Sequence, residues 1–158
     1  MKLQITLLLN LLLFVSLAQE SQIINAYNLR YINYEKSLTI QQEIELNSEK
    51  NKDKETNFIS NCFLTLTYLR EKKLQLAKNA IDKATKLFAE IKNDNALGYY
   101  YYALYRFNYF IDQGNLEDDL LKALTNFEKS KNYYFASLTA ISIANSGEYI
   151  NKKFLDKG

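Results

Sequence analysis

Tyrosine side chains are concentrated in one short stretch of this chain. Four consecutive tyrosines occupy residues 99–102, and Tyr105 and Tyr109 follow within two helical turns. On a helix, residues three or four positions apart share a face. A polar and aromatic row with this spacing is formed by Tyr101, Tyr105, Asn108 and Asp112. Phenol rings stack on apolar groups and their hydroxyls form hydrogen bonds, so this tyrosine row is the candidate peptide-binding groove. The alternative is that the rings fill wide gaps between long helices.

Most of the residue types that catalysis needs are missing or poorly placed. The chain has no histidine, which excludes His-dependent nucleophiles and His-ligated zinc. The acidic residues of segment 112–119 do not follow the spacing of a calcium loop. Glu117, Asp118 and Asp119 instead suit the first turn of a helix, where the helix dipole favours negative charge. We therefore expect a protein that is not an enzyme, with no catalytic residue, no metal and no cofactor.

Composition narrows the fold class and the partners further. A typical chain of 158 residues would hold about eleven glycines and eight prolines, but this one has four and none. Folds rich in tight turns, such as sandwiches and barrels, are therefore disfavoured. Lys and Arg number 20 against 18 Asp and Glu, a net charge of +2. A nearly neutral chain has no surface for a phosphate backbone, so no nucleic-acid partner is expected.

Residues 1–18 have the pattern of a secretory signal peptide. A lysine after the first methionine precedes an apolar run that ends at Leu17. Ser16 and Ala18 supply small residues at the −3 and −1 positions of a cleavage site before Gln19. The alternative is an uncleaved membrane anchor, although the run is shorter than the ~20 residues that span a bilayer. The expected location is the periplasm or the extracytoplasmic face of the membrane.

The single cysteine, Cys62, cannot form an internal disulfide bond. Packing alone must then hold the fold in an oxidising compartment. Its apolar neighbours Phe63 and Leu64 predict a buried and unreactive thiol.

Apolar residues recur at steps of three and four along most of the chain, which indicates amphipathic helices. Residues 19–50 predict one long N-terminal helix, and the polar run after it predicts a turn. Five further helices are expected, with breaks at residues 70–73, 93–95, 112–115 and 131–132. Asn93, Asn95 and Asn115 can cap the helices that follow them. Gly114 can adopt the left-handed conformation at the end of the preceding helix.

The turns between these helices recur at a fixed spacing. One set shares a Phe or Tyr, then Leu or Ile, then polar residues and, in two of its members, a final Gly; it comprises residues 68–72, 110–114 and 154–158. The opposite set comprises residues 52–53, 93–94 and 132–133. Two interleaved sets with a common period of about 40 residues predict stacked helical hairpins, which is the pattern of an α-solenoid.

Residues 51–158 resemble the tetratricopeptide repeat (TPR) family in its longer variant. Thr65, Tyr68, Ala77, Ile81 and Ala84 follow that family's order of small, aromatic, Ala, large and Ala. A second, looser match is formed by Ala123, Phe127 and Ser130. The family's terminal proline is absent from both units. With its leader, the chain also looks like the N-terminal region of Bacteroidetes TPR sensor proteins, in which a periplasmic repeat domain precedes a membrane span and a cytoplasmic output domain.

The resemblance implies an all-α, TPR-like α-solenoid of antiparallel helical hairpins, preceded by the long N-terminal helix. About two and a half units would occupy residues 51–158. The last unit would then lack its second helix and expose a face with Ala140, Ile143, Gly147, Ile150 and Phe154, so we expect the chain to be a fragment.

The functional expectation follows from the same resemblance. The chain would bind a peptide or protein segment in its concave groove, as the extracytoplasmic input region of a larger signal-transduction or transcription-regulatory protein. The alternative is a free-standing exported scaffold or assembly factor of the cell envelope. Membrane contact is expected only through a downstream span or an uncleaved leader. A homodimer is compatible with either alternative.

Overall fold

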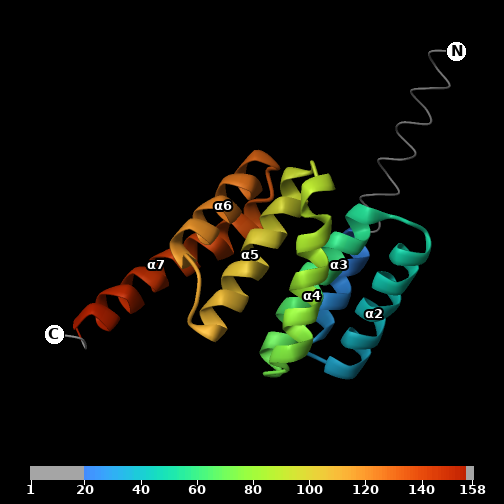
Figure 1. The fold of residues 1–158 in the computed structure, drawn as a ribbon, viewed down its shortest axis with the longest axis horizontal. Coiled ribbons are helices and arrows are strands. Elements are labelled where there is room, and N and C mark those ends of the chain that lie inside the picture. Colours follow the sequence, from blue (N-terminus) through green and yellow to red (C-terminus); the bar gives the residue numbers. More distant parts are fainter. Residues whose placement is uncertain (1–19, 156–158) are drawn as a thin grey trace, which may run out of the picture.

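The computed structural model describes residues 20–155, and the side chains of residues 20–146. Within this range the chain is helical and contains no strand (Figure 1). The all-α expectation is confirmed. After a first helix over residues 20–29, the elements are α2 (Tyr34–Lys50), α3 (Lys54–Arg70), α4 (Leu74–Leu87) with the short 3-10 turn η1 (Phe88–Glu90), α5 (Asp94–Ile111), α6 (Leu116–Lys129) and α7 (Tyr133–Leu155).

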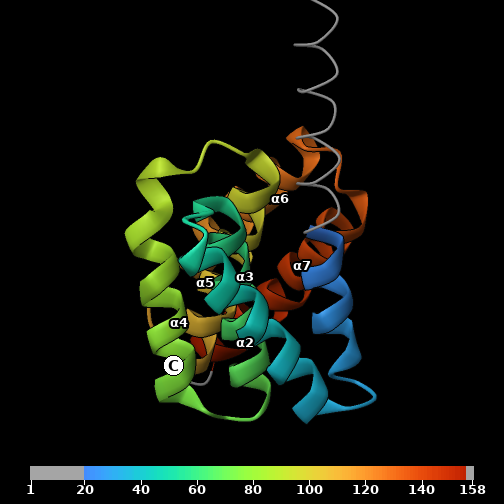
Figure 2. The same ribbon diagram turned by 90° about the vertical axis from the view of Figure 1, so that its right-hand side faces the viewer.

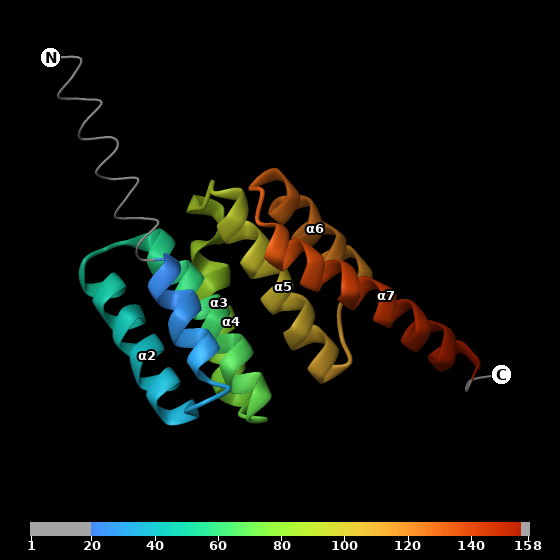
Figure 3. The same cartoon turned by 180° about the vertical axis from the view of Figure 1, so that it is seen from behind.

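Successive helices pack side by side as hairpins along one row. Helix α3 packs against α2 and α4, and α6 packs against α5 and α7. Helix α3 also packs against α5, so the first helices of neighbouring hairpins contact each other. Viewed from the end of the row, α4 lies on the side opposite to the first helix and α7 (Figure 2). From behind, α7 runs past the ends of α5 and α6 (Figure 3). This arrangement is compatible with an α-solenoid.

The expectation of one long N-terminal helix is wrong, because the helix breaks at residues 30–33. The Asn33 side chain accepts a hydrogen bond from the backbone N of Lys36 at 3.0 Å and caps α2. The hydroxyl of Ser37 donates to the backbone O of Ala26 at 2.7 Å, which holds the two helices together as a hairpin. The apolar spacing predicted a continuous helix because Tyr31 and Ile32 fit it. Both side chains nevertheless lie at the surface, 68% and 86% exposed. The N-terminal segment is therefore a hairpin of its own.

The helix starts show the repeat more clearly than the apolar spacing does. The N-cap residues Asn33, Asp53, Lys73 and Asn93 lie at intervals of 20 residues, which makes 40 for each hairpin. Three turns also share a lysine with positive φ directly before the cap: Lys52, Lys72 and Lys131, at 57°, 56° and 59°. The period of about 40 residues is thus present in the structure and extends to the N-terminal hairpin.

The predicted caps Asn93 and Asn115 are confirmed, whereas Asn95 lies within α5 and its side chain accepts hydrogen bonds from Ser130 and Asn132. Asn93 accepts from the backbone N atoms of the second and third residues after it, and Asn115 accepts from the backbone N of Asp118 at 3.2 Å. Gly114 has a positive φ as predicted, but the residue that ends α5 in the left-handed conformation is Asp112, two residues earlier, with φ 54°. Gly114 follows at φ 80°, where a Cβ would lie 2.6 Å from Nδ2 of Asn108. An Asp in place of the expected Gly is tolerated because its short polar side chain reduces the steric cost of this conformation.

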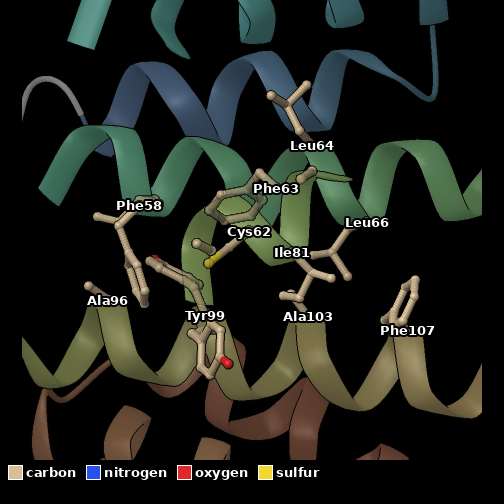
Figure 4. Packing of buried hydrophobic residues seen from close by; sticks show 14 of the residues in the cluster. Phe58, Cys62, Phe63, Leu64, Leu66, Ile81, Ala96, Tyr99, Ala103 and Phe107 are labelled. Atoms are coloured by element: carbon tan, nitrogen blue, oxygen red, sulfur yellow. The ribbon is translucent and has the colours of Figure 1, made fainter. Parts of the chain in front are cut away.

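Phe63 lies at the centre of the hydrophobic core and is fully buried (Figure 4). Its ring centroid is 4.8 Å from that of Tyr27 in the first helix and 4.9 Å from that of Tyr99 in α5. The ring of Phe135 in α7 lies 5.9 Å away. Four helices therefore meet at one phenylalanine. The neighbouring Cys62 is fully buried as predicted, and burial raises the pKa of its thiol.

A glycine in α5 permits the close approach of α6. A Cβ on Gly98 would lie 2.6 Å from Cδ1 and Cε1 of Phe127, whose ring is fully buried. Replacing Gly by Ala in a helix normally stabilises a protein by about 1 kcal/mol. Here we expect Gly98→Ala to lower the free energy of unfolding by about 1–3 kcal/mol, because a packed ring has no room to move. Urea denaturation measures this change.

The double variant Gly98→Ala/Phe127→Leu provides the control. If the clash is the cause, its loss of stability is smaller than the sum of the two single losses. A Gly98→Ala protein that is more stable than the wild type would contradict the expectation.

Two sequence expectations fall on residues outside the description. The signal peptide, residues 1–18, is not described, and neither are the side chains of Gly147, Ile150 and Phe154 on the face predicted to be uncovered. Earlier on that helix, Ala140 is exposed and Ile143 is half-buried. None of the helices between residues 20 and 155 combines the length and apolar character that a membrane span requires.

Candidate binding groove

The tyrosine row does not line one open groove. The ring of Tyr101 packs against Phe88 of η1 at a centroid distance of 5.8 Å, and the ammonium group of Lys122 lies 5.5 Å from the ring centroid. Tyr105 is 6% exposed and lines a small cavity of about 210 Å³ together with Ser142 and neighbouring residues of α7. Burial raises the pKa of Tyr105. These two tyrosines therefore occupy interhelical gaps, which corresponds to the gap-filling alternative.

The two polar members of the row also have structural roles. Nδ2 of Asn108 donates to the Asp119 carboxylate of α6 at 2.9 Å, and Asp112 ends α5. Asp118 accepts from Nζ of Lys122 at 2.6 Å. The acidic residues thus lie in the first turn of α6 behind the cap Asn115, where Asp118 and Asp119 pair with Lys122 and Asn108. Among residues 20–146, no group of three or more potential metal ligands gathers at one place.

A groove is open elsewhere, between α2 and α4, and α3 forms its floor. We call it the outer groove, because its walls are the second helices of two neighbouring hairpins. One half has a volume of about 460 Å³ and the other about 440 Å³. The apolar half is lined by Gln42, Glu45, Leu46, Asn61, Leu64, Tyr68, Leu76, Asn79, Ala80 and Lys83. The charged half is lined by Glu45, Ser48, Glu49, Lys52, Asp53, Lys54, Asn57, Lys83, Lys86 and Leu87.

An ion pair crosses the outer groove where its halves meet. Nζ of Lys83 on α4 lies 2.7 Å from Oε1 of Glu45 on α2. The Glu45 side chain is 8% exposed and that of Lys83 is 51% exposed. The hydrogen bond to Glu45 raises the pKa of Lys83, so its cationic form is favoured. A carboxylate buried to this degree needs its partner, and the pair therefore holds α2 and α4 at a defined separation.

The apolar half presents leucines on both walls. Leu46 on α2 is 60% exposed and Leu76 on α4 is 44% exposed. Between them, the hydroxyl of Tyr68 accepts a hydrogen bond from Nε2 of Gln42 at 2.9 Å. Apolar walls with a few fixed polar groups are typical of sites that bind another molecule.

The charged half is lined by residues from both helix ends and from the turn after α2. Lys54 pairs with Glu90, and Asp53 caps α3 by accepting from the backbone N of Thr56 at 3.1 Å. Lys52 and Lys86 are exposed. This half offers exposed ammonium groups next to the leucine-lined half, so the two halves differ in chemistry along the groove.

Sequence reasoning missed the outer groove. Leu46 fits the apolar spacing of the N-terminal segment but is exposed, and Leu76 lies beside the buried residues Ala77 and Ala80 of α4. Helices α2 and α4 are not consecutive in the chain, so whether a groove opens between them depends on how far α3 separates them. The available signal was weak: Leu76 directly precedes the buried Ala77 and breaks the polar face of the helix.

Comparison with known proteins assigns no relative to this chain. No protein-family model matches it, and no curated protein and no solved structure is significantly similar to it. Any functional conclusion therefore rests on the residues and the geometry described above.

Proposed function

We propose that this protein is a non-enzymatic scaffold that binds a peptide or protein segment in the outer groove. The observation that carries the proposal is the pair of exposed leucines, Leu46 and Leu76, on opposite walls of a groove with a polar floor. From Gln42 to Glu49 the groove follows α2 for about 11 Å, at 1.5 Å per residue. This length suits about two turns of a bound helix or about three residues of an extended peptide.

We also propose the family and the place of action. Hairpins that repeat every 40 residues, with N-caps of their first helices at Asp53 and Asn93, support a TPR-like repeat of the long variant. The apolar leader before Gln19 supports an extracytoplasmic location. The role we propose there is that of the input region of a larger signal-transduction or regulatory protein, like the sensors that the sequence resembles. Sequencing of the DNA beyond codon 158 tests this role. A membrane span and an output domain encoded there would support the input region of a larger protein, and a stop codon would favour a free-standing envelope scaffold.

The test of the groove uses a peptide selected on the protein itself. A random peptide library displayed on phage is selected on the purified full chain, and one enriched peptide is made with a fluorescent label. We expect the double variant Leu46→Glu/Leu76→Glu to bind this peptide at least about tenfold more weakly, because it places two charges on apolar contact surface. Fluorescence anisotropy measures the affinity.

The matched control is Leu121→Glu on α6, a site that is 48% exposed and does not line the outer groove. It is expected to bind like the wild type. Equal affinities for the wild type and the double groove variant, with unchanged helical circular dichroism, would reject the groove as the binding site.

A further inference from the structure

The chain contains only three arginines, Arg30, Arg70 and Arg106, and two of them come together. Arg30 and Arg70 are 40 residues apart, at the same position of successive repeats, and each follows a leucine at the end of its helix. Nη1 of Arg70 donates to the backbone O of Arg30 at 3.3 Å. The repeat therefore places two guanidinium groups next to each other at the ends of two parallel helices.

Tyrosine rings surround the buried Arg30. Its guanidinium carbon lies 3.2 Å from the ring centroid of Tyr27 and 3.9 Å from that of Tyr31. Nη1 donates to the backbone O of Tyr27 at 2.6 Å, and Nη2 donates to the Tyr31 hydroxyl. The residue is only 8% exposed. Cation–π contacts and neutral acceptors thus hold this cation, and among the described residues it has no carboxylate partner.

Arg70 is the accessible member of the pair. Its guanidinium carbon lies 4.8 Å from the Tyr31 ring centroid, and its side chain is 42% exposed. The nearest described carboxylate oxygen, on Glu71, is 3.9 Å from Nε, which is too far for a hydrogen bond. Burial and the neighbouring charge of Arg70 both lower the pKa of Arg30. Two positive groups with so little compensation form a site where an external anion would be stabilised.

Exposed apolar and aromatic groups border this pair. Tyr31 is 68% exposed, Ile32 is 86% exposed, and Tyr134 at the start of α7 is 63% exposed and lies near enough to Arg30 to influence its pKa. We name these residues the arginine–tyrosine patch: Tyr27, Arg30, Tyr31, Ile32, Arg70 and Tyr134. In this patch, an arginine guanidinium group, which can bind a carboxylate through two N–H groups, lies next to tyrosine rings and an aliphatic side chain. Such a surface suits an acidic side chain next to an apolar one.

We propose that the arginine–tyrosine patch binds an acidic peptide segment, with a carboxylate on Arg70 and an adjacent apolar side chain on Tyr31 and Ile32. This second surface extends the proposed scaffold role, and it shares no residue with the outer groove. A nucleic acid fits less well, because two adjacent arginines on a chain of net charge +2 do not track a phosphate backbone.

The test uses a fluorescein-labelled peptide of three Gly-Asp-Leu-Asp repeats with both ends blocked. Its binding to the full chain is followed by fluorescence anisotropy at low salt. We expect Arg70→Gln to weaken binding about tenfold or more, because a charge-assisted hydrogen bond is lost. Arg70→Lys keeps the charge but loses the planar fork, and an intermediate affinity is expected.

Two controls separate this site from general charge and from the outer groove. Lys129→Gln removes one positive charge on α6 and is expected to change the affinity less than twofold. Leu46→Gln/Leu76→Gln alters the groove without changing the net charge and is expected to leave binding of the acidic peptide unchanged, so the two proposals can fail separately. Circular dichroism confirms that each variant is folded, and the buried Arg30 is left in place.

Three results would overturn the proposal. The first is equal weakening by Arg70→Gln and Lys129→Gln, which would indicate net charge alone. The second is equal binding of a peptide in which Asn replaces every Asp. The third is the absence of peptide binding together with Arg70-dependent binding to phosphatidylglycerol vesicles, which would assign the patch to a membrane surface.

Discussion

Replacing Phe63 by alanine is expected to lower the free energy of unfolding by about 3–5 kcal/mol. The ring is fully buried and contacts the rings of Tyr27, Tyr99 and Phe135, which belong to three other helices. Removing it leaves a cavity at the point where these helices meet, and a dense interior closes such a cavity only in part. Because one ring connects the first helix with α5 and α7 through α3, the loss affects the whole row.

Equilibrium denaturation with urea or guanidinium measures this loss. Phe110→Ala is the matched control, since Phe110 is 44% exposed, and we expect it to cost less than about 1 kcal/mol. Hydrogen exchange adds a local measure: residues 20–29 should exchange faster in Phe63→Ala, because Tyr27 loses its ring partner. Similar losses for the two variants would show that Phe63 is not the centre of the core.

Alkaline pH is expected to destabilise the protein strongly between about pH 10 and pH 12. Burial raises the pKa of Tyr27 from 10.0 to about 12, although the charge of Arg30 acts in the opposite direction. Below pH 10, Tyr27 is neutral in both states and its contribution to stability is fully present. Above pH 10 the unfolded state loses its proton first and is favoured, so stability falls until the folded pKa is reached. At 1.36 kcal/mol per pKa unit, Tyr27 alone accounts for about 2–3 kcal/mol.

Other tyrosines of the core also lower the stability of the folded state as the pH rises above 10. Burial raises the pKa values of Tyr99, Tyr100 and Tyr105. The carboxylate of Glu20 raises the pKa of Tyr99 further, because its Oε1 accepts a hydrogen bond from the Tyr99 hydroxyl at 2.8 Å. These tyrosines steepen the loss of stability above pH 10.

Unfolding curves in urea at several pH values from 8 to 12 measure this dependence. Tyr27→Phe should reduce the loss of stability between pH 10 and pH 12, because the phenol that titrates there is gone. Tyr133→Phe is the control, since Tyr133 is 68% exposed, and its pH dependence should match that of the wild type. A Tyr27→Phe protein with an unchanged slope would refute the assignment.

Capping chemistry and local spacing were sufficient to predict most of the helices. The side chains of Asn93 and Asn115 start α5 and α6 as expected, because an N-cap acts within three residues of itself. The turn period of about 40 residues was also visible without coordinates, since it depends only on helix length and turn chemistry. Likewise, the apolar neighbours of Cys62 were enough to predict its burial.

The break at residues 30–33 and the tyrosine row could not be predicted in this way. Tyr31 and Ile32 continue an apolar spacing but lie at the surface, and nothing local reveals that. Tyr101 and Tyr105 share a face of α5, yet only the packing of η1 and α7 against that face decides that they fill gaps. The exposure of a side chain depends on the helices that pack around it, and its residue type alone does not determine it.

The two proposed binding surfaces depend on tertiary structure for the same reason. Leu46 and Leu76 face each other, and Arg30 meets Arg70, across distances of 30 and 40 residues in the chain. The sequence by itself determined the helical fold class, the starts of the helices after α2, the repeat period and the absence of histidine chemistry, because these depend on residue type and on short-range hydrogen bonds. Only the tertiary structure decided which side chains remain open between the helices, because this depends on how α3 separates α2 from α4 and how the first helix ends beside it.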